Sequence, residues 1–242
     1  MRKHGGLGLI EMMLSLFLTS VLLGALMGHY LIVKQQYYRA QDLLEQALEL
    51  DWVDDLIRES VQRAGFTPCI GLSWLKTIDS RNGKKLKAIE VRHPQSLMTY
   101  RMNELFNSVL RYDKKSVTIG GNSSYKRKQA VLIADCFHAE VKEIAAIQHH
   151  KDGQTIGLKT SLLFNYMEPI YLGEWVEEHF FIHKNNSGKN ALYYQREHAE
   201  ELTPAINNLS ATIHLRQRIM TQILLTLTSG ETVEIEAAAR AS

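Results

Sequence analysis

Two successive hydrophobic patterns occupy the first quarter of the chain. From Leu7 to Val33 the sequence is apolar almost throughout and contains a single carboxylate, Glu11. Beyond Val33, apolar residues recur every three to four positions as far as Ala64, which is the spacing of an amphipathic helix. No Gly or Pro lies between His29 and Ala64, so the two patterns together predict one helix from Leu7 to Ala64. At about 1.5 Å per residue, its apolar half is long enough to cross a bilayer.

The hydrophobic period then shortens to two, which is typical of strands with one buried face. The expected strands are Leu86–Val91, Ser116–Ile119, Ala130–Ala134, Ala139–Ile147, Thr155–Leu163, Trp175–Ile182, Ala191–Arg196, Ala211–Leu215, Ile223–Thr228 and Thr232–Glu236. Ser229-Gly230-Glu231 predicts the turn of a closing hairpin. The segment from Leu97 to Leu110 is ambiguous, and a short helix is one interpretation of it. We therefore expect an α+β fold, in which a long N-terminal helix packs on a largely antiparallel sheet.

Glu11 is the residue in the apolar run that most needs an explanation. An unpartnered charge at the edge of a spanning segment costs on the order of a few kcal/mol, so it marks a function by default. A cleaved secretory signal has an apolar region of only about 7 to 15 residues followed by spaced small residues, and this run is too long and lacks them. A plain signal anchor fits the length and the basic start at Arg2 and Lys3, but it leaves Glu11 unexplained.

The segment Gly6-Leu7-Gly8-Leu9-Ile10-Glu11 resembles the class III signal of type IV prepilins, in which a short basic leader ends in glycine and a glutamate follows shortly before an apolar helix. Leu7 stands where Phe is usual, and Gly8 where Thr or Ser is usual. The resemblance implies that the prepilin peptidase cleaves between Gly6 and Leu7 and that the new amino terminus, on Leu7, is N-methylated. It also implies that Glu11 pairs with the terminal amine of a neighbouring subunit during assembly, because an ion pair in low dielectric satisfies both groups.

The resemblance also implies a division of the chain and a location. Residues 1–6 would be the leader, 7–33 the transmembrane and filament-core half of the helix, 34–64 its amphipathic half, and 65–242 a β-rich periplasmic domain of the pilin fold. The protein would cross the inner membrane once, with a cytoplasmic N terminus, and then enter the pilus filament. Gly24 and Gly28 are candidates for close helix packing or for a local loosening of the helix, and the alternative is that they do nothing specific.

Further motifs are similar to those of PilW-type minor pilins. They are Arg63-Ala64-Gly65-Phe66-Thr67-Pro68-Cys69, Asp135-Cys136, Phe180-Phe181-Ile182, Asn186-Ser187-Gly188 and Ala191 to Glu197, with Leu202 to Ile213 where that family has a late helix-to-strand element. This similarity implies a non-enzymatic minor pilin that helps to initiate assembly together with other minor pilins, the major pilin and the inner-membrane assembly platform. The pilus would serve adhesion, twitching motility or DNA uptake. A type II secretion pseudopilin is one alternative. A signal-anchored periplasmic enzyme or binding domain is another, from a different functional class.

The two cysteines, Cys69 and Cys136, both fall in the part that the expected topology places outside the cytoplasm, where disulfides form. We expect them to be bridged, and the alternative is two buried thiols. A bridge would tie the segment after the helix to the middle of the β-rich region.

Composition adds little that is specific. The chain has 242 residues and a net charge of +2, which is too small to indicate a nucleic-acid-binding protein by itself. No H-E-x-x-H, C-x-x-C, G-x-S-x-G, G-x-G-x-x-G or Walker motif is present. The pair His179-x-x-x-His183 could hold a metal on a helix, but Trp175–Ile182 alternates as a strand. We therefore expect no catalytic residue, no metal and no cofactor.

Basic residues gather beside turn residues at Lys84-Lys85-x-Lys87, Lys114-Lys115 and Tyr125-Lys126-Arg127-Lys128. Solvated loops are the ordinary interpretation of such clusters. The sharper hypothesis is a surface that contacts DNA through Lys126, Arg127 and Lys128, because lysines can bind phosphates without sequence preference.

Overall fold

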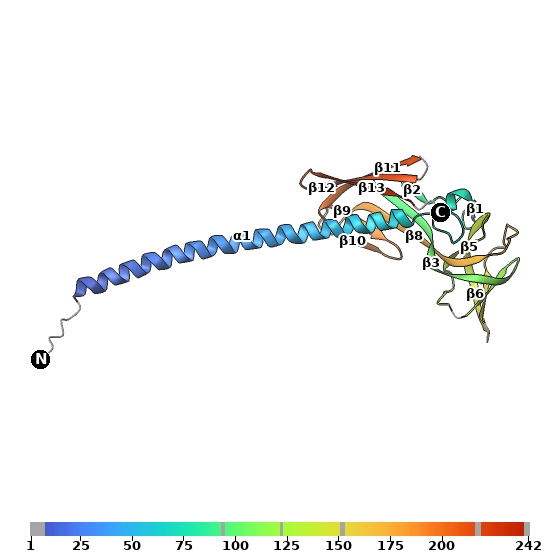
Figure 1. The fold of residues 1–242 in the computed structure, drawn as a ribbon, viewed down its shortest axis with the longest axis horizontal. Coiled ribbons are helices and arrows are strands. Elements are labelled where there is room, and N and C mark those ends of the chain that lie inside the picture. Colours follow the sequence, from blue (N-terminus) through green and yellow to red (C-terminus); the bar gives the residue numbers. More distant parts are fainter. Residues whose placement is uncertain (1–7, 93–94, 122, 151–152, 216–218, 240–242) are drawn as a thin grey trace. The chain divides into compact units, whose positions relative to one another are not determined.

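The computed structural model describes residues 8–92, 95–121, 123–150, 153–215 and 219–239. The expected cleavage site between Gly6 and Leu7 lies outside these residues. Contacts divide the chain into two compact units, Met1–Asp51 and Trp52–Ser242. Figure 1 shows the elements in chain order.

The N-terminal element is helix α1, Leu9–Arg63, so the predicted helix is confirmed over the described residues. Its end is set by Gly65, whose φ of +75° suits glycine and whose N–H donates to the Tyr100 carbonyl at 2.7 Å. A Cβ on Gly65 would lie 2.8 Å from the Cβ of Ala88, so a side chain has no room there. Val53, Ile57 and Val61 are spaced four residues apart and are fully buried, so this face of the last turns forms part of the core.

A short 3-10 helix and thirteen strands follow α1 among the described residues. They are η1 Leu72–Trp74, β1 Lys76–Asp79, β2 Ile89–Arg92, β3 Ser96–Asp113, β4 Ser116–Gly120, β5 Ala130–Ala134, β6 His138–His150, β7 Gly153–Leu158, β8 Tyr171–Lys184, β9 Asn190–Gln195, β10 Ala199–Thr203, β11 Ile206–Leu215, β12 Ile219–Leu227 and β13 Thr232–Ala238. The described strands pair antiparallel except for β1 and β6, which pair parallel. The α+β class and the largely antiparallel sheet are thus confirmed.

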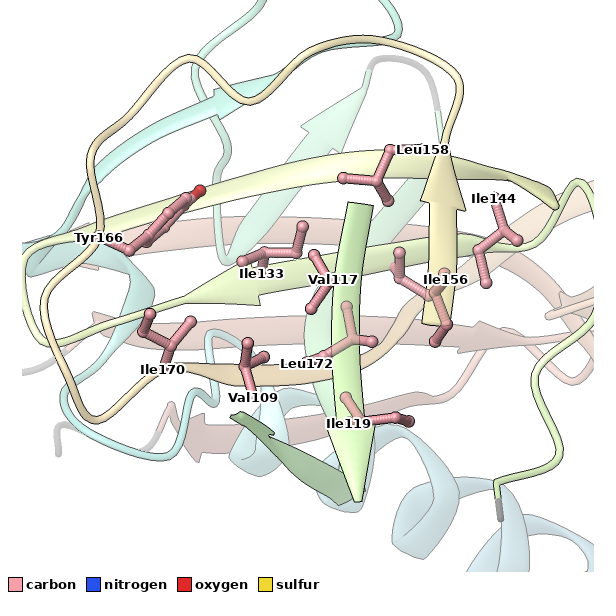
Figure 2. Packing of buried hydrophobic residues seen from close by; sticks show 11 residues of the cluster. Val109, Val117, Ile119, Ile133, Ile144, Ile156, Leu158, Tyr166, Ile170 and Leu172 are labelled. Atoms are coloured by element: carbon pink, nitrogen blue, oxygen red, sulfur yellow. The ribbon is translucent and has the colours of Figure 1, made fainter. Parts of the chain in front are cut away.

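Six strands pair in a closed ring. Going round it, β3 pairs with β4, β4 with β7, β7 with β6, β6 with β5, β5 with β8, and β8 with β3 again. A sheet that closes on itself has no free edge and encloses a core of inward-facing side chains. Figure 2 shows this core, with side chains such as Val117, Ile119, Ile133 and Ile156 fully buried between the strands.

Strand β5 has both faces buried. Val131 and Ile133 belong to the core inside the ring, whereas Leu132 and Ala134 pack with Leu72 and other residues in a second core outside it. This double burial explains why Ala130–Ala134 is apolar at every position instead of alternating.

Strands β3 and β8 continue beyond the ring and pair there with β2 and β9, and β9 pairs with β10. Strands β11, β12 and β13 form a separate three-stranded sheet. The last turns of α1 contact both sheets. Ser60 bonds to Thr99 of β3 and to Glu178 of β8, and Arg58 donates to the Glu236 carbonyl of β13 at 2.9 Å.

Several element predictions need correction. The segment Leu97–Leu110 is part of strand β3 and holds no helix. Its pattern is ambiguous because a bulge between Met102 and Phe106 interrupts the period of two. The predicted strand Thr155–Leu163 ends at Leu158. Beyond it, the Ser161 carbonyl and the Leu163 N–H bond to the buried side chains of Lys142 and Glu140.

The late segment 202–213 also differs from expectation. It contains the end of β10 and most of β11, and no helix. Strands β1 and β10 were not predicted, because each is short and carries too little alternation to be recognised.

Candidate functional site

The apolar half of α1 is long and apolar enough to cross a membrane, by length and composition. From Leu9 to Val33 its side chains are exposed. The hydroxyl groups of Ser15 and Ser20 donate to the carbonyls of Met12 and Phe17 at 2.9 and 2.8 Å, and Thr19 donates to Ser15. Polar groups satisfied within the helix are compatible with a lipid environment.

Glu11 is the only Asp, Glu, Lys or Arg between Leu9 and Val33. It lies in the first turn of α1, where a negative charge is favoured by the helix dipole. Its carboxylate makes no ion pair or hydrogen bond within the described residues. A Cβ on Gly24 or Gly28 would meet nothing within 4 Å, so this face of the helix has open space for a neighbour. The roles predicted for these residues stay predictions.

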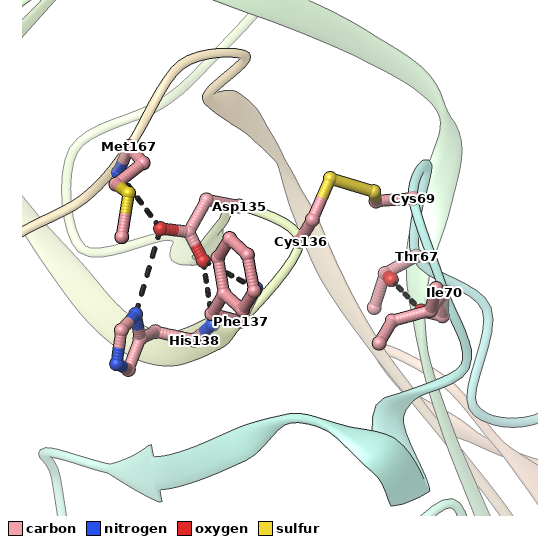
Figure 3. The surroundings of a disulfide bond; sticks show 8 residues. All are labelled: Thr67, Cys69, Ile70, Asp135, Cys136, Phe137, His138 and Met167. Atoms are coloured by element: carbon pink, nitrogen blue, oxygen red, sulfur yellow. Dashed lines mark hydrogen bonds and ion pairs between the residues drawn. A yellow bond between two sulfur atoms is a disulfide. The ribbon is translucent and has the colours of Figure 1, made fainter.

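A disulfide joins Cys69 to Cys136 and confirms the expected bridge, with the two Cα atoms 5.2 Å apart (Figure 3). It connects the segment after α1 to the turn between β5 and β6. The turn itself is organised by Asp135, whose side chain is fully buried and accepts hydrogen bonds from the backbone N–H groups of Phe137, His138 and Met167.

Burial by itself would raise the pKa of the Asp135 carboxyl, but these N–H donors outweigh it and hold the pKa below the usual value of 3.8. A group whose pKa is depressed in the folded state stabilises the fold above its unfolded pKa. That contribution is lost as the pH falls through the folded pKa.

We therefore expect Asp135→Asn to be less stable than the wild type at neutral pH by about 1–3 kcal/mol, because charge-assisted hydrogen bonds are lost. The difference should shrink as the pH falls below about 4, the ordinary pKa of an unfolded Asp, and then through the lower pKa of Asp135 in the folded state. Urea unfolding of the full chain in detergent, followed from about pH 6 to pH 2, measures it. Asp113→Asn, at an exposed site, should run parallel to the wild type. A constant difference across this range would contradict the prediction.

Two further clusters of charged residues are buried, and the sequence analysis predicted neither of them. Lys142 and Glu140 are both fully buried on β6 and their charged groups are 2.9 Å apart. Glu178 accepts hydrogen bonds from Ser60 of α1, from Arg101 of β3 and from Tyr194 of β9 at 2.7, 3.1 and 3.2 Å. For Glu178 the signal in the sequence was a charged residue between Val176 and Phe180 on one face of a strand, where alternation predicts a buried side chain. Glu140 and Lys142 alternate with Ala139 and Val141, so strand alternation predicts them to be exposed and gives no such signal.

Two of the three basic clusters line neighbouring hollows. One hollow, of about 960 Å³, lies beside Trp175–Glu177 of β8 and is walled by Lys126, Arg127 and Lys128. We call it the β8 notch. The second, of about 510 Å³, is lined by Lys84, Lys85 and Lys87 among others. Lys114 and Lys115 lie at the turn from β3 to β4 and line neither of these hollows.

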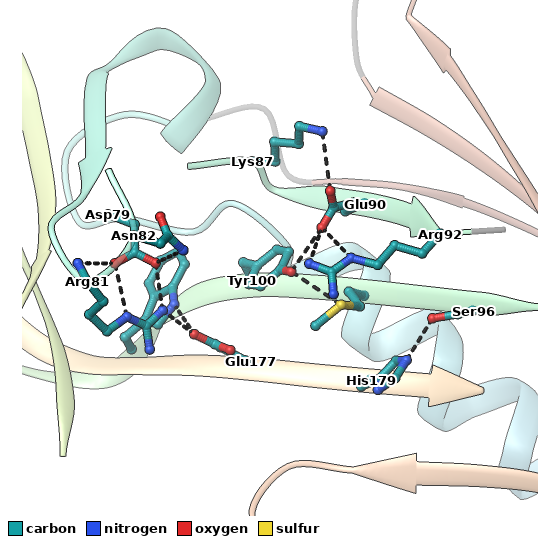
Figure 4. Close-up of polar contacts among 12 residues, drawn as sticks. Asp79, Arg81, Asn82, Lys87, Glu90, Arg92, Ser96, Tyr100, Glu177 and His179 are labelled. Carbon is teal, nitrogen blue, oxygen red and sulfur yellow. Dashed lines mark hydrogen bonds and ion pairs between the residues drawn. The ribbon is translucent and has the colours of Figure 1, made fainter. Parts of the chain in front are cut away.

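The two hollows share Arg81, Trp175 and Glu177. Arg81 donates to Asp79 at 2.8 and 2.9 Å and to Glu177 at 2.5 Å, as Figure 4 shows. The Trp175 indole N–H also donates to Glu177, at 2.9 Å. Burial would raise the pKa of the Asp79 carboxyl, but the hydrogen bonds from Arg81 hold it below its usual value. This network keeps the floor between the hollows rigid and its charges paired.

The histidines that the structure describes are not gathered into a metal site. Among the described residues, no group of three or more His, Cys, Asp and Glu side chains could hold a metal ion. His179 and His183 both lie on strand β8, which extends beyond the predicted strand Trp175–Ile182 at both ends. His179 is half-buried, bonds to Ser96 and stacks on Phe181 with ring centroids 4.4 Å apart. Burial, and then the nearby charge of Arg92, lower its pKa below 6.5.

Comparison of the chain with protein-family models, with curated proteins and with solved structures finds no match.

Proposed function

We propose that this chain is a minor pilin of a type IV pilus. It would be made as a prepilin and held in the inner membrane by its apolar helix until assembly. The observation that carries the proposal is Glu11, the one acidic residue of the exposed apolar part of α1, four residues after Leu7. Leu7 would be the first residue of the mature chain. A carboxylate at this depth in a membrane is costly unless an amine or another cation partners it.

Two further features support the proposal. Helix α1 runs without a break from the apolar segment into turns that are buried against the β-rich domain, so one element could serve as membrane anchor and as filament core. The Cys69–Cys136 disulfide is typical of proteins that fold in an oxidising compartment, as the periplasm is. In the assembled pilus, the exposed apolar side chains of α1 would pack on the helices of other minor pilins and of the major pilin.

Two linked measurements test the proposal. Mass spectrometry of the mature protein should find a chain that begins at N-methylated Leu7, because the prepilin peptidase would remove residues 1–6. The Glu11→Ala variant should still be produced and cleaved but should be absent from sheared pili, because it lacks the carboxylate that would attract the terminal amine of a neighbouring subunit. Asp42→Ala is the matched control, as it removes an exposed carboxylate from the same helix outside the apolar part.

The outcomes separate the alternatives. An uncleaved chain starting at Met1 contradicts the pilin proposal and favours a signal-anchored protein. Normal incorporation of Glu11→Ala removes the role of Glu11 and leaves the cleavage prediction standing. Deletion of the gene distinguishes a pseudopilin, because secretion would then fail while pili remain intact.

A further inference from the structure

Strand β8 has an open stretch of edge in the middle of its length. Along one side it pairs with β3. Along the other side it pairs with β5 over Tyr171–Glu174 and with β9 over His179–Lys184. No described strand lies opposite Trp175–Glu178 on that side. Strands β5 and β9 therefore pair with the same side of β8, one after the other along its length. A gap of four β8 residues, or about 13 Å, lies between them.

The backbone groups of two residues point into this gap. The carbonyl of Ile170, just before β8, accepts from Val109 of β3, and the N–H of Ile182 donates to Gln95, just before β3. Even-numbered positions of β8 therefore turn their N–H and C=O groups toward β3. Because these directions alternate along an antiparallel strand, Trp175 and Glu177 turn theirs to the other side. An unpaired strand edge of this kind is a template for an added strand.

The gap is hollow. It coincides with the β8 notch, whose lining includes Trp175, Val176 and Glu177. Its walls are the segment before β5, with Lys126 to Lys128, and the segment after β9, with Arg196 to His198. The first wall is held in place, because the Lys128 N–H donates to the Ile144 carbonyl and the Lys126 N–H donates to the Gln129 side chain, both at 2.8 Å.

The charges of the notch are uneven. Arg81 pairs with Glu177, and Arg196 pairs with Glu174. Lys126 and Lys128 are exposed and have no acidic partner among the described residues, whereas the free carboxylates of Glu197 and Glu200 lie toward the opposite wall. An occupant should therefore present negative charge to the Lys126–Lys128 wall.

We propose that the β8 notch binds an extended acidic peptide segment of a partner protein, which adds as a short strand to the Trp175–Glu177 edge and places a carboxylate beside Lys126 and Lys128. Backbone hydrogen bonds supply the affinity of such strand addition, and side-chain contacts supply its specificity. A nucleic acid would satisfy the two lysines, but it has no row of amide groups at strand spacing to complement the edge. The proposal does not depend on the assignment of the chain as a pilin.

The test uses the full chain in detergent micelles and a fluorescein-labelled synthetic peptide, acetyl-Thr-Asp-Val-Asp-Val-Thr-amide, with fluorescence anisotropy as the readout. We expect saturable binding that weakens about tenfold or more when alternate amides of the peptide are N-methylated, because N-methylation removes the strand hydrogen bonds and leaves the charge unchanged. We expect a similar weakening for the Lys126→Glu/Lys128→Glu variant. The matched control is Lys114→Glu/Lys115→Glu, which makes the same charge change outside the notch and should bind normally.

Three results would overturn the proposal. The first is no saturable binding of the peptide at about 1 mM, which corresponds to only about 4 kcal/mol. The second is equal affinity for the N-methylated peptide, which would leave only charge attraction. The third is a pair of observations on the wild type. Unlabelled peptide does not displace the labelled peptide, and a single-stranded DNA oligomer binds in a salt-dependent way. This result would identify the notch as a phosphate-binding surface.

Discussion

Replacing Lys142 with Met is expected to lower the free energy of unfolding by about 3–5 kcal/mol, because it leaves the carboxylate of Glu140 buried without its cation. Both side chains are fully buried, and their charged groups are 2.9 Å apart. Met fills much of the same volume, so the loss reports the charge more than a cavity. Urea unfolding of the full chain in detergent measures the effect. The fluorescence of Trp175, which is only 5% exposed, reports on the core beside the ring of strands.

The Lys159→Met variant is the matched control. Lys159 also pairs with a glutamate, Glu143, at 3.0 Å, but its side chain is 63% exposed, so its loss should cost less than about 1 kcal/mol. The double variant Glu140→Gln/Lys142→Met should be more stable than Lys142→Met alone, since no unpaired charge then remains buried. If Lys142→Met and Lys159→Met were equally stable, the buried pair would have no special role.

The Glu140–Lys142 pair also explains the shape of the segment that follows β7. The Lys142 ammonium donates to the Ser161 carbonyl, and the Glu140 carboxylate accepts from the Leu163 N–H at 3.1 Å and from the Tyr166 hydroxyl at 2.7 Å. Buried charges thus take the place of a strand partner for this backbone. Loss of either charge should loosen the segment first, as faster amide hydrogen exchange at Leu163 than at ring residues such as Ile156.

Removing the disulfide with Cys69→Ser/Cys136→Ser is expected to cost about 4 kcal/mol, because the bridge closes a loop of 67 residues and restricts the unfolded chain. The same urea titration of the full chain measures the loss. The wild type treated with a reductant should unfold at the same urea concentration as the double variant. A midpoint unchanged by both treatments would contradict the prediction.

The disulfide is expected to act on the whole domain and not only on its own surroundings. It joins the segment that leaves α1 to the turn between β5 and β6, and both strands belong to the closed ring. We therefore expect the double variant to unfold in one transition with the ring. An early separate loss of structure near Asp135, seen by hydrogen exchange, would instead indicate a local role for the bridge.

The sequence by itself determined the elements whose cause is local. The helix from Leu9 to Arg63 follows from spacing and from the glycine at position 65 that ends it. Most strands follow from a period of two. The disulfide was expected because both cysteines fall in the part of the chain that the predicted topology places outside the cytoplasm. The position of Glu11 in an otherwise uncharged run is also visible without coordinates.

Only the tertiary structure decided how these strands pair. The ring closes because β3 and β8, more than fifty residues apart in the chain, lie side by side, and no local pattern encodes such a register. The same long-range pairing brings Glu178 to Ser60 and Arg101. It also leaves Trp175 and Glu177, on the side of β8 that faces away from β3, without a pairing strand among the described residues. Hydrophobic periodicity indicates which face of a strand or helix is buried. Which segment buries that face, and where a strand edge has no partner, depend on packing between distant segments.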